Sequence, residues 1–320
     1  RSHKNGLKVI IDIVPNHVAR AYQSQHKPAG VADFGANDDT SVEYHRENNS
    51  HYIPDSQLEL PHIDPAFTPL GGEAHPSPEV PFVEKRAQWT GHGSRLAKPN
   101  LVDWYETVKI NYGIKPDGSK DFPELPQGYE DKDYIEHYHY WQQFDVPSSW
   151  VKFRDIALYW IAKGVDGFRY DMAEMVPVEF WSYLNSHIKA RYPDALLLAA
   201  IYEPHRYRDY LGRGKMDVLY SKMEIYDAVK AVMKSEAAAS RIRDAFDSHA
   251  DIDAQMLFFL ENHDEQRIAS EQFMGSGRAG LPGALATIML GKGPVMIYFA
   301  QELGEAADKD AGFGKASRTT

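Results

Sequence analysis

Charged and polar side chains recur at the ends of short apolar runs in this sequence. The sets are Asp12 with Asn16 and His17, Arg169 with Asp171, and His263 with Asp264. Because parallel strands bring their carboxyl ends to one edge of a sheet, we expect these groups to meet there. The crowded charges would be costly unless a ligand or a reaction needs them. A carboxylate at the carboxyl end of a barrel strand is also where that architecture performs its chemistry.

The stretch from Gly164 to Asp171 is predicted to be a short buried strand that follows an amphipathic helix. Residues alternate between the two faces of a strand, so Arg169 and Asp171 share one face, with Phe168 and Tyr170 on the other. The aromatic face can pack under helices. Burying an Arg and a carboxylate costs free energy unless the two charges pair with each other or with a ligand. A purely structural ion pair is the alternative explanation.

Strands and helices alternate along most of the chain. The predicted strands are 7–14, 164–171, 195–202, 216–220, 256–260 and 294–299. One predicted helix is capped by Ser148 or Ser149, another starts at Pro177, and two more fill roughly 226–246 and 281–290. This alternation predicts a parallel sheet covered by helices. An eight-stranded barrel would need two more strands, which we expect upstream of Arg1.

The stretch 18–145 lacks sustained periodicity, and a loop-rich insertion of this length is usually functional. It is rich in aromatic residues that suit stacking on sugar rings, although most aromatics in any domain are core. They include Trp89, Trp104, Tyr105, Tyr112, Tyr138, Tyr140 and Trp141.

The composition of the 320 residues excludes several classes of protein. With 43% hydrophobic residues the chain can form a real core, and the formal net charge of -11 argues against nucleic acid or an acidic membrane surface as a partner. There are no cysteines, and hence no disulfides and no thiolate metal site. No apolar run reaches the ~20 residues of a membrane span, and no signal peptide is visible. No glycine-rich phosphate loop follows a strand, which argues against nucleotide binding.

In its motifs the sequence resembles the α-amylase superfamily, glycoside hydrolase family 13. The resemblance rests on Asp12-Ile-Val-Pro-Asn-His17, Gly167-Phe-Arg-Tyr-Asp171 and Glu261-Asn-His-Asp264, in the family's order and strand context. It implies an α/β fold, a (β/α)8 TIM barrel with the third strand in 1–17, an irregular domain B in 18–145, and strands four to eight in 146–320. The family's first two strands and its C-terminal β-sandwich are not in this sequence.

The resemblance also implies roles for individual residues. Asp171 would be the nucleophile that forms a covalent glycosyl-enzyme, and Arg169 would keep it ionised and oriented. Asp264 would bind sugar hydroxyls and stabilise the transition state. The remaining substrate-binding residues would be Asp12, His17 and His263. In a retaining enzyme of this kind, the nucleophile and the proton donor sit about 5 Å apart.

The proton donor is where the sequence departs from the family. The family's Glu near the end of the fifth strand falls on Ala200, and the nearest carboxylate, Glu203, lies three residues on, before Pro204. An odd offset places Glu203 on the opposite strand face, and Pro204 indicates that the strand has already ended. We favour an engineered Glu-to-Ala variant. The alternatives are a bulge that lets Glu203 serve, and a naturally inactive relative that binds sugar or a partner protein.

A calcium ion is also implied by the resemblance, with Asn16 as a ligand, because the family often holds this metal between barrel and domain B. The Lys-His pair of the calcium-binding members is replaced here by Glu174 and Met175, which weakens that expectation. No organic cofactor is expected, and His137-Tyr-His139 is only a weak zinc signal.

The expected reaction is retaining hydrolysis of α-1,4-glucans or maltooligosaccharides. Transglycosylation or isomerisation by the same machinery and a non-enzymatic sugar-binding or scaffold protein are the alternatives. The family favours an extracytoplasmic location, secreted or periplasmic. The sequence gives no indication of the oligomeric state.

Overall fold

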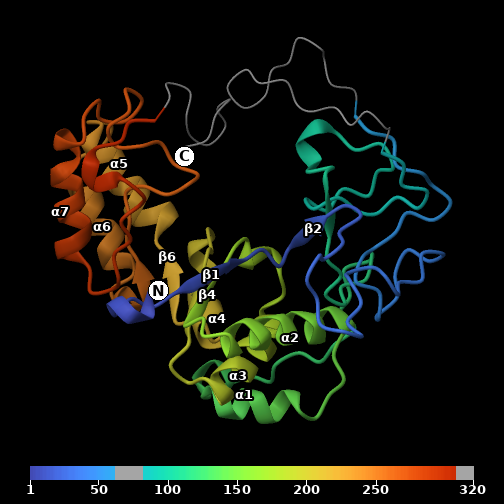
Figure 1. Cartoon of the computed structure of the whole chain (residues 1–320). Helices are drawn as coiled ribbons and strands as arrows, with labels where there is room; N and C mark the ends of the chain where they lie inside the picture. Colours follow the sequence, from blue (N-terminus) through green and yellow to red (C-terminus); the bar gives the residue numbers. More distant parts are fainter. Residues whose placement is uncertain (62–81, 308–320) are drawn as a thin grey trace. The chain divides into compact units, whose positions relative to one another are not determined.

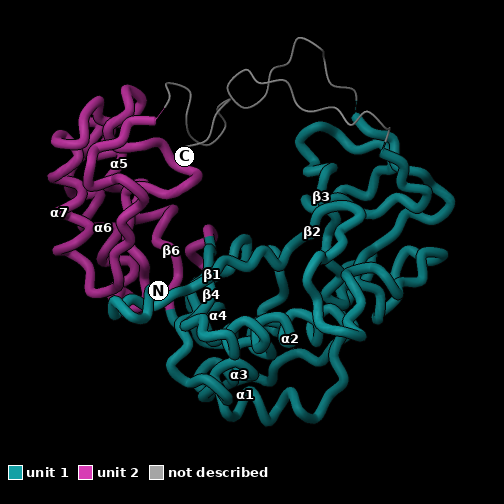
Figure 2. Tube along the Cα trace, viewed as in Figure 1, with its two compact units in different colours: residues 1–63, 79–201, 206–217 teal, residues 64–78, 202–205, 218–320 magenta. Residues whose placement is uncertain are grey.

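The computed structural model describes residues 1–61 and 82–307. The chain divides into two compact units (Figure 2). The first contains the described residues of 1–63, 79–201 and 206–217, and the second those of 64–78, 202–205 and 218–320. Within the described ranges, no helix has the length and apolar character that a membrane crossing requires.

The first unit is built on three parallel strands, β1 (Ile10–Ile13), β4 (Gly167–Tyr170) and β5 (Leu196–Ala199), of which Figure 1 labels β1 and β4. Strand β4 pairs with both of the others and therefore lies between them. Ile10 pairs with Gly167, and Gly167 pairs with Leu196. A Cβ on Gly167 would come within 2.1 Å of the Leu196 carbonyl oxygen, so only glycine permits this approach. All three strands are shorter than the sequence predicts.

Helices α2 (Ser148–Ala162) and α3 (Val178–Arg191) confirm two of the predicted helices. The aromatic face of β4 packs against α3 as expected, because the Tyr170 ring lies 4.5 Å from that of Trp181 and its hydroxyl donates to Asn185 Oδ1 at 3.0 Å. The predicted serine cap of α2 is wrong. Its N-cap is Pro147, and the Ser148 hydroxyl donates instead to the Glu47 carbonyl at 2.6 Å.

Helices α1 (Tyr134–Trp141) and α4 (Tyr207–Gly212) complete the first unit. Helix α1 was not predicted, although Asp133 caps it well by accepting hydrogen bonds from the backbone of Ile135 and Glu136. Both α1 and α2 contact α3. The described part of the insertion is otherwise largely irregular, with one antiparallel pair, β2 (His17–Ala19) and β3 (Thr107–Lys109).

Most of the aromatic residues that the sequence offers for sugar stacking are core. Trp89, Tyr112, Tyr140 and Trp141 are buried. The side chains that keep partial exposure are Trp104, Tyr105 and Tyr138.

The second unit contains the parallel pair β6 (Val218–Tyr220) and β7 (Met256–Leu257), with helices α5 (Asp227–Met233), α6 (Ser240–Ser248) and α7 (Leu281–Leu290). A π-type turn, Lys222–Tyr226, leads into α5. The single helix predicted over 226–246 is in fact two helices, α5 and α6. The break follows α5, where Ser235 adopts a left-handed backbone conformation. The predicted strand 294–299 is reduced to one parallel bridge between Phe258 and Val295.

Short 3-10 turns connect these elements. They are His3–Asn5, Leu101–Asp103, Tyr129–Asp131, Ala173–Met175, Pro204–Arg206, Asp253–Gln255, Arg278–Gly280 and Gln301–Leu303. The alternation of parallel strands and helices confirms the predicted α/β class.

Candidate active site

Arg169 joins two carboxylates at the centre of the first unit. Its Nη1 donates to Asp12 Oδ1 and Oδ2 at 3.1 and 2.9 Å, and lies 2.7 Å from Asp171 Oδ1. Arg169 is buried, whereas the side chains of Asp12 and Asp171 remain 52% and 24% exposed. The guanidinium therefore offsets the repulsion between two carboxylates that both keep access to solvent. This arrangement is suited to fixing the orientation of the Asp171 carboxylate.

The strand register places residue 200 beside Asp171. Tyr170 pairs with Ala199, and the Ala200 amide continues the ladder by donating to the Tyr170 carbonyl at 3.0 Å. Residues 171 and 200 are therefore the next neighbours across two adjacent parallel strands, which lie about 4.8 Å apart. Paired residues of parallel strands point to the same face. Ala200 is 1% exposed and carries no group that can give a proton.

Glu203 lies outside this register. Strand β5 ends at Ala199, as Pro204 predicts, and Glu203 follows in irregular chain assigned to the second unit. Its side chain is 51% exposed and lies 3.6 Å from His205 Nε2. The register therefore aligns Ala200, and not Glu203, with Asp171.

His17 begins β2 next to the Asp12 strand. Its ring packs 5.6 Å from that of Trp104, which in turn lies 5.1 Å from His92. Trp104 has a left-handed backbone (φ 53°), an unusual conformation for a bulky residue, and such outliers cluster at functional sites. Burial lowers the pKa of His17, and the negative charge of Asp171 partly opposes that shift. His17 is therefore a neutral hydrogen-bonding group at neutral pH.

Asn16 is buried, and the orientation of its amide follows from its partners. Its Oδ1 accepts from the ammonium of Lys109, and its Nδ2 donates to the Gly91 carbonyl at 2.9 Å. The same Nδ2 lies 3.2 Å from His17 Nδ1, which must then be the acceptor. The proton of the neutral His17 ring consequently resides on Nε2.

The surroundings of Asn16 do not fit the expected calcium. Calcium takes six to eight oxygen ligands, usually with carboxylates among them. Here the Asn16 oxygen already faces the ammonium of Lys109. Within residues 1–61 and 82–307, no three His, Cys, Asp or Glu side chains form a group that could hold a metal ion. His137 of the weak zinc signal is a buried structural residue, bonded to Ser182 and Tyr129 at 2.7 Å each.

His263 and Asp264 lie in the second unit, after β7. The loop is held by Asn262, whose Oδ1 accepts from the backbone of Asp264 and Glu265 at 2.8 and 2.9 Å. His263 Nε2 lies 3.3 Å from Asp264 Oδ2, with the His263 side chain half-exposed. The loop thus presents both groups to the surface of their unit.

The first residue of that motif, Glu261, is structural in this unit. It is buried, accepts from the Ile268 backbone at 2.6 Å and pairs with Arg267 at 2.8 Å. Burial raises the pKa of Glu261, which the positive charge of Arg267 and the hydrogen bond from Ile268 oppose.

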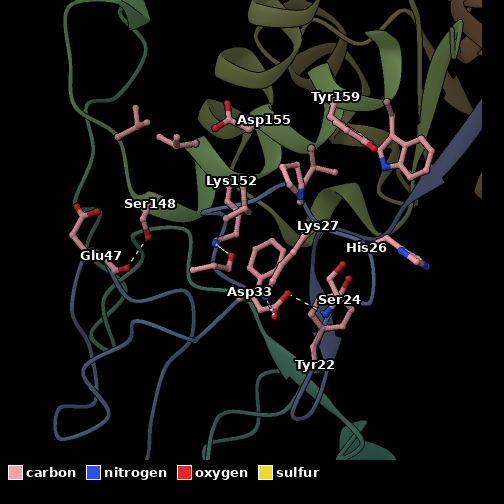
Figure 3. A pocket seen from close by; sticks show the side chains of 18 residues that line it. Tyr22, Ser24, His26, Lys27, Asp33, Glu47, Ser148, Lys152, Asp155 and Tyr159 are labelled. Atoms are coloured by element: carbon pink, nitrogen blue, oxygen red, sulfur yellow. Dashed lines mark hydrogen bonds and ion pairs between the residues drawn. The ribbon is translucent and has the colours of Figure 1, made fainter. Parts of the chain in front are cut away.

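A cavity of about 610 Å³ lies elsewhere in the first unit, between segment 22–34 and helix α2 (Figure 3). Lys152 crosses it to donate to the Ala32 carbonyl at 2.6 Å, and Asp33 pairs with Lys27. A largely apolar pocket is the usual first hypothesis for a ligand site. None of the motif residues lines this cavity, however, so the chemistry is assigned to the strand ends instead.

Sequence reasoning missed Lys109 and His92, and it did not place Trp104 beside His17. Trp104 was one of many aromatics in the insertion, and the left-handed backbone that distinguishes it has no signal in the sequence. Lys109 is separated from Asn16 by 93 residues, so no local pattern could have linked them.

Comparison with known proteins covers both the sequence and the fold. A family model described as "Alpha amylase, catalytic domain" matches residues 138–317. An α-1,4-glucan:maltose-1-phosphate maltosyltransferase of Cereibacter sphaeroides is 25% identical over 238 residues, 72% of this chain and 33% of that protein. Neopullulanase 2 of Thermoactinomyces vulgaris is 26% identical over 166 residues, 49% of this chain and 27% of that protein.

Solved structures share the fold at lower identity. The ligand-free cyclic α-maltosyl-(1→6)-maltose hydrolase of Arthrobacter globiformis is 18% identical with a TM-score of 0.59, over 98% of this chain and 55% of that chain. A cyclomaltodextrinase is 19% identical with a TM-score of 0.58, over 98% of this chain and 42% of that chain. This chain thus spans about a third of the first curated relative and about half of these structures. The similarity confirms the predicted barrel fold.

Proposed function

Because the chain belongs to the α-amylase catalytic-domain family, we propose that it is the site-bearing part of a retaining α-glucan-active enzyme with Asp171 as nucleophile. The observation that carries this proposal is the register of β4 and β5, which sets residues 171 and 200 side by side. The separation of neighbouring strands matches the roughly 5 Å between the two carboxyl groups of retaining enzymes.

The proposed reaction has two steps. A carboxylate oxygen of Asp171 attacks the anomeric carbon, and the bond from that carbon to the leaving oxygen breaks. The leaving oxygen normally takes a proton from an acid at position 200. In the second step a water oxygen bonds to the anomeric carbon as the ester bond to Asp171 breaks, and the group at position 200 takes a proton from that water. With Ala200 in that position, a poor leaving group has no donor, and the water that must hydrolyse the glycosyl ester has no base.

The substrate class is proposed from the chemistry of the site and from the relatives. The maltosyltransferase, neopullulanase and cyclomaltodextrinase names all refer to α-linked glucans, and we assign this chain to α-1,4-glucans or maltooligosaccharides. Asp12, His17, His263 and Asp264 are proposed to bind the sugar.

Transfer to a sugar acceptor is the second candidate, because several relatives of the chain are named maltosyltransferases. Hydrolysis and transfer share the glycosyl-enzyme and differ in the acceptor that completes the reaction. A sugar-binding protein without activity is a third candidate, since Ala200 alone removes the acid.

Trapping the glycosyl-enzyme tests the proposal. p-Nitrophenyl α-maltoside needs little acid assistance to lose its phenolate, whereas breakdown of the ester needs the missing base. The full-length protein with Ala200 should therefore release one equivalent of p-nitrophenol in a burst and gain the mass of the transferred glycosyl group. Peptide mapping should place that mass on Asp171, and Asp171→Asn should abolish both signals.

A label on another residue, or a burst that survives Asp171→Asn, would refute the assignment of the nucleophile. Sugar binding by calorimetry without any covalent label would favour the binding-protein candidate. Adding maltose as an acceptor separates the enzymatic candidates, because only transfer converts the trapped species into a longer oligosaccharide.

A further inference from the structure

The ammonium of Lys109 lies where three separate segments of the first unit meet. Lys109 ends strand β3, and its Nζ donates to Asn16 Oδ1, in the link between β1 and β2. The same nitrogen donates to the Met175 carbonyl at 3.3 Å, in the 3-10 turn after β4. Asp171 lies between β4 and this turn, so the ammonium joins the insertion to the segment that carries the nucleophile.

Both acceptors are neutral oxygens. Among the described residues, the side-chain ammonium of Lys109 donates to the Asn16 amide oxygen and to the Met175 carbonyl. Neutral oxygens converging on one point favour a monovalent cation over a divalent one, for which carboxylate ligands would be expected.

A calcium ion could not share this place. The ion would have to use the Asn16 oxygen that the ammonium occupies, and it would be repelled by the charge of Lys109 at contact distance. The Asn16 ligand that the family resemblance assigns to calcium is thus present in the sequence but is engaged by a side chain.

We propose that Lys109 is the resident cation of this junction, so that the protein binds no calcium at Asn16 and needs none there for stability. The covalent tether makes this cation insensitive to chelators and to the metal concentration of the surroundings. It also fixes the Asn16 amide, since an ammonium can only face Oδ1, and thereby leaves Nδ2 to donate to His17. The proposal concerns the junction itself and stands apart from the proposed function.

Thermal unfolding of the full-length protein tests this directly. The melting temperature of the unmodified protein should be the same in excess CaCl2 and in EDTA. Lys109→Met removes the charge and keeps the length of the side chain, and should lower the melting temperature by about 5 °C in both solutions. Lys85→Met, at an exposed position of the same insertion, is the matched control and should leave the melting temperature unchanged.

Two results would overturn the proposal. One is a rise in the melting temperature of the unmodified protein with calcium that Asn16→Ala abolishes, since it would place the metal at Asn16. The other is a loss in Lys109→Met no larger than that in Lys85→Met. Calorimetric titration of calcium into the unmodified protein checks the first of these results by direct binding. A heat of binding that EDTA removes and that Asn16→Ala lacks would place the metal at Asn16.

Discussion

Restoring a carboxylic acid at position 200 should return activity selectively. Ala200 is buried directly after β5, and the strand register makes it the neighbour of Asp171. A Glu side chain at that position should extend toward the anomeric carbon that Asp171 is proposed to attack. Ala200→Gln is the matched control, because it has the same size and shape but cannot give a proton at neutral pH.

The magnitude follows from what the acid contributes. General acid catalysis supplies about 10²- to 10⁴-fold, or roughly 3–5 kcal/mol of the barrier. That full factor applies to maltotriose, whose leaving group is a sugar alkoxide. For p-nitrophenyl α-maltoside the first step gains little, because the phenolate leaves readily. Overpacking at this buried position costs about 1–3 kcal/mol of stability, so both variants should melt below the parent.

Initial rates of the parent, Ala200→Glu and Ala200→Gln on both substrates form the assay. We expect Ala200→Glu to raise kcat/KM on maltotriose by at least about 100-fold, with a smaller effect on the first turnover of the aryl maltoside. Equal gains on both substrates, or equal gains from Gln, would show that the substitution acts through packing and not through a proton. Fast maltotriose cleavage by the parent would mean that another group is the acid.

Three further perturbations test the site and its scaffold. In the Ala200→Glu background, Arg169→Met should lower kcat for p-nitrophenyl α-maltoside by about 100-fold. The reason is that Asp12 and Asp171 both lose the cation with which they pair. Gly167→Ala should cost about 3 kcal/mol in urea unfolding, because the new Cβ meets the Leu196 carbonyl at 2.1 Å. Burial lowers the pKa of His137 to about 4 from 6.5, so the folded state binds fewer protons than the unfolded state between these values. Stability should therefore be full above pH 6.5 and fall by up to about 3 kcal/mol toward pH 4, and His137→Gln should flatten that loss while exposed His139→Gln should not.

Each of these expectations can fail on its own. Arg169→Met with unchanged kcat would make the ion pair a structural feature only. A mild Gly167→Ala variant would mean that β4 and β5 can separate locally. A loss of stability toward acid that persists in His137→Gln would assign the effect to other buried histidines, such as His51 and His187, whose pKa values burial also lowers to about 4.

What could be predicted from the sequence was the part governed by short-range patterns. The alternation in 167–171 placed Arg169 and Asp171 on one face, and the structure joins them by an ion pair. Helices α2 and α3 follow from their apolar spacing, α3 also from Pro177 at its start, and α7 lies over the predicted range 281–290. In these helices the local propensity agrees with the tertiary packing, because the apolar side of α3 is the side that α1 and α2 cover.

Some failures have local causes, and others arise from contacts between distant parts of the chain. Residues 234–239, Lys-Ser-Glu-Ala-Ala-Ala, contain good helix formers, yet α5 ends there because Ser235 turns into the left-handed region. Helix α1 has only eight residues, rich in aromatics and histidine, too short for a clear periodicity. The contact of Lys109 with Met175 spans 66 residues of the chain. Such contacts exist only once the strands have paired, and no window of sequence contains both partners.

The pairing of β4 and β5 decides whether Glu203 can take the place of an acid at position 200. Sequence offers Glu203 as a substitute, and a shift of β5 by three residues would bring it opposite Asp171. A shift by an odd number exchanges the two faces of the strand, so buried Leu197 and Ala199 would move to the face of Arg169. The observed pairing is held by four residue pairs and extended by the Ala200 amide, with the Gly167 contact to Leu196 permitting no side chain between them. Glu203 could therefore act only from the chain beyond the strand. A missing acid in this protein is thus best repaired at position 200 itself.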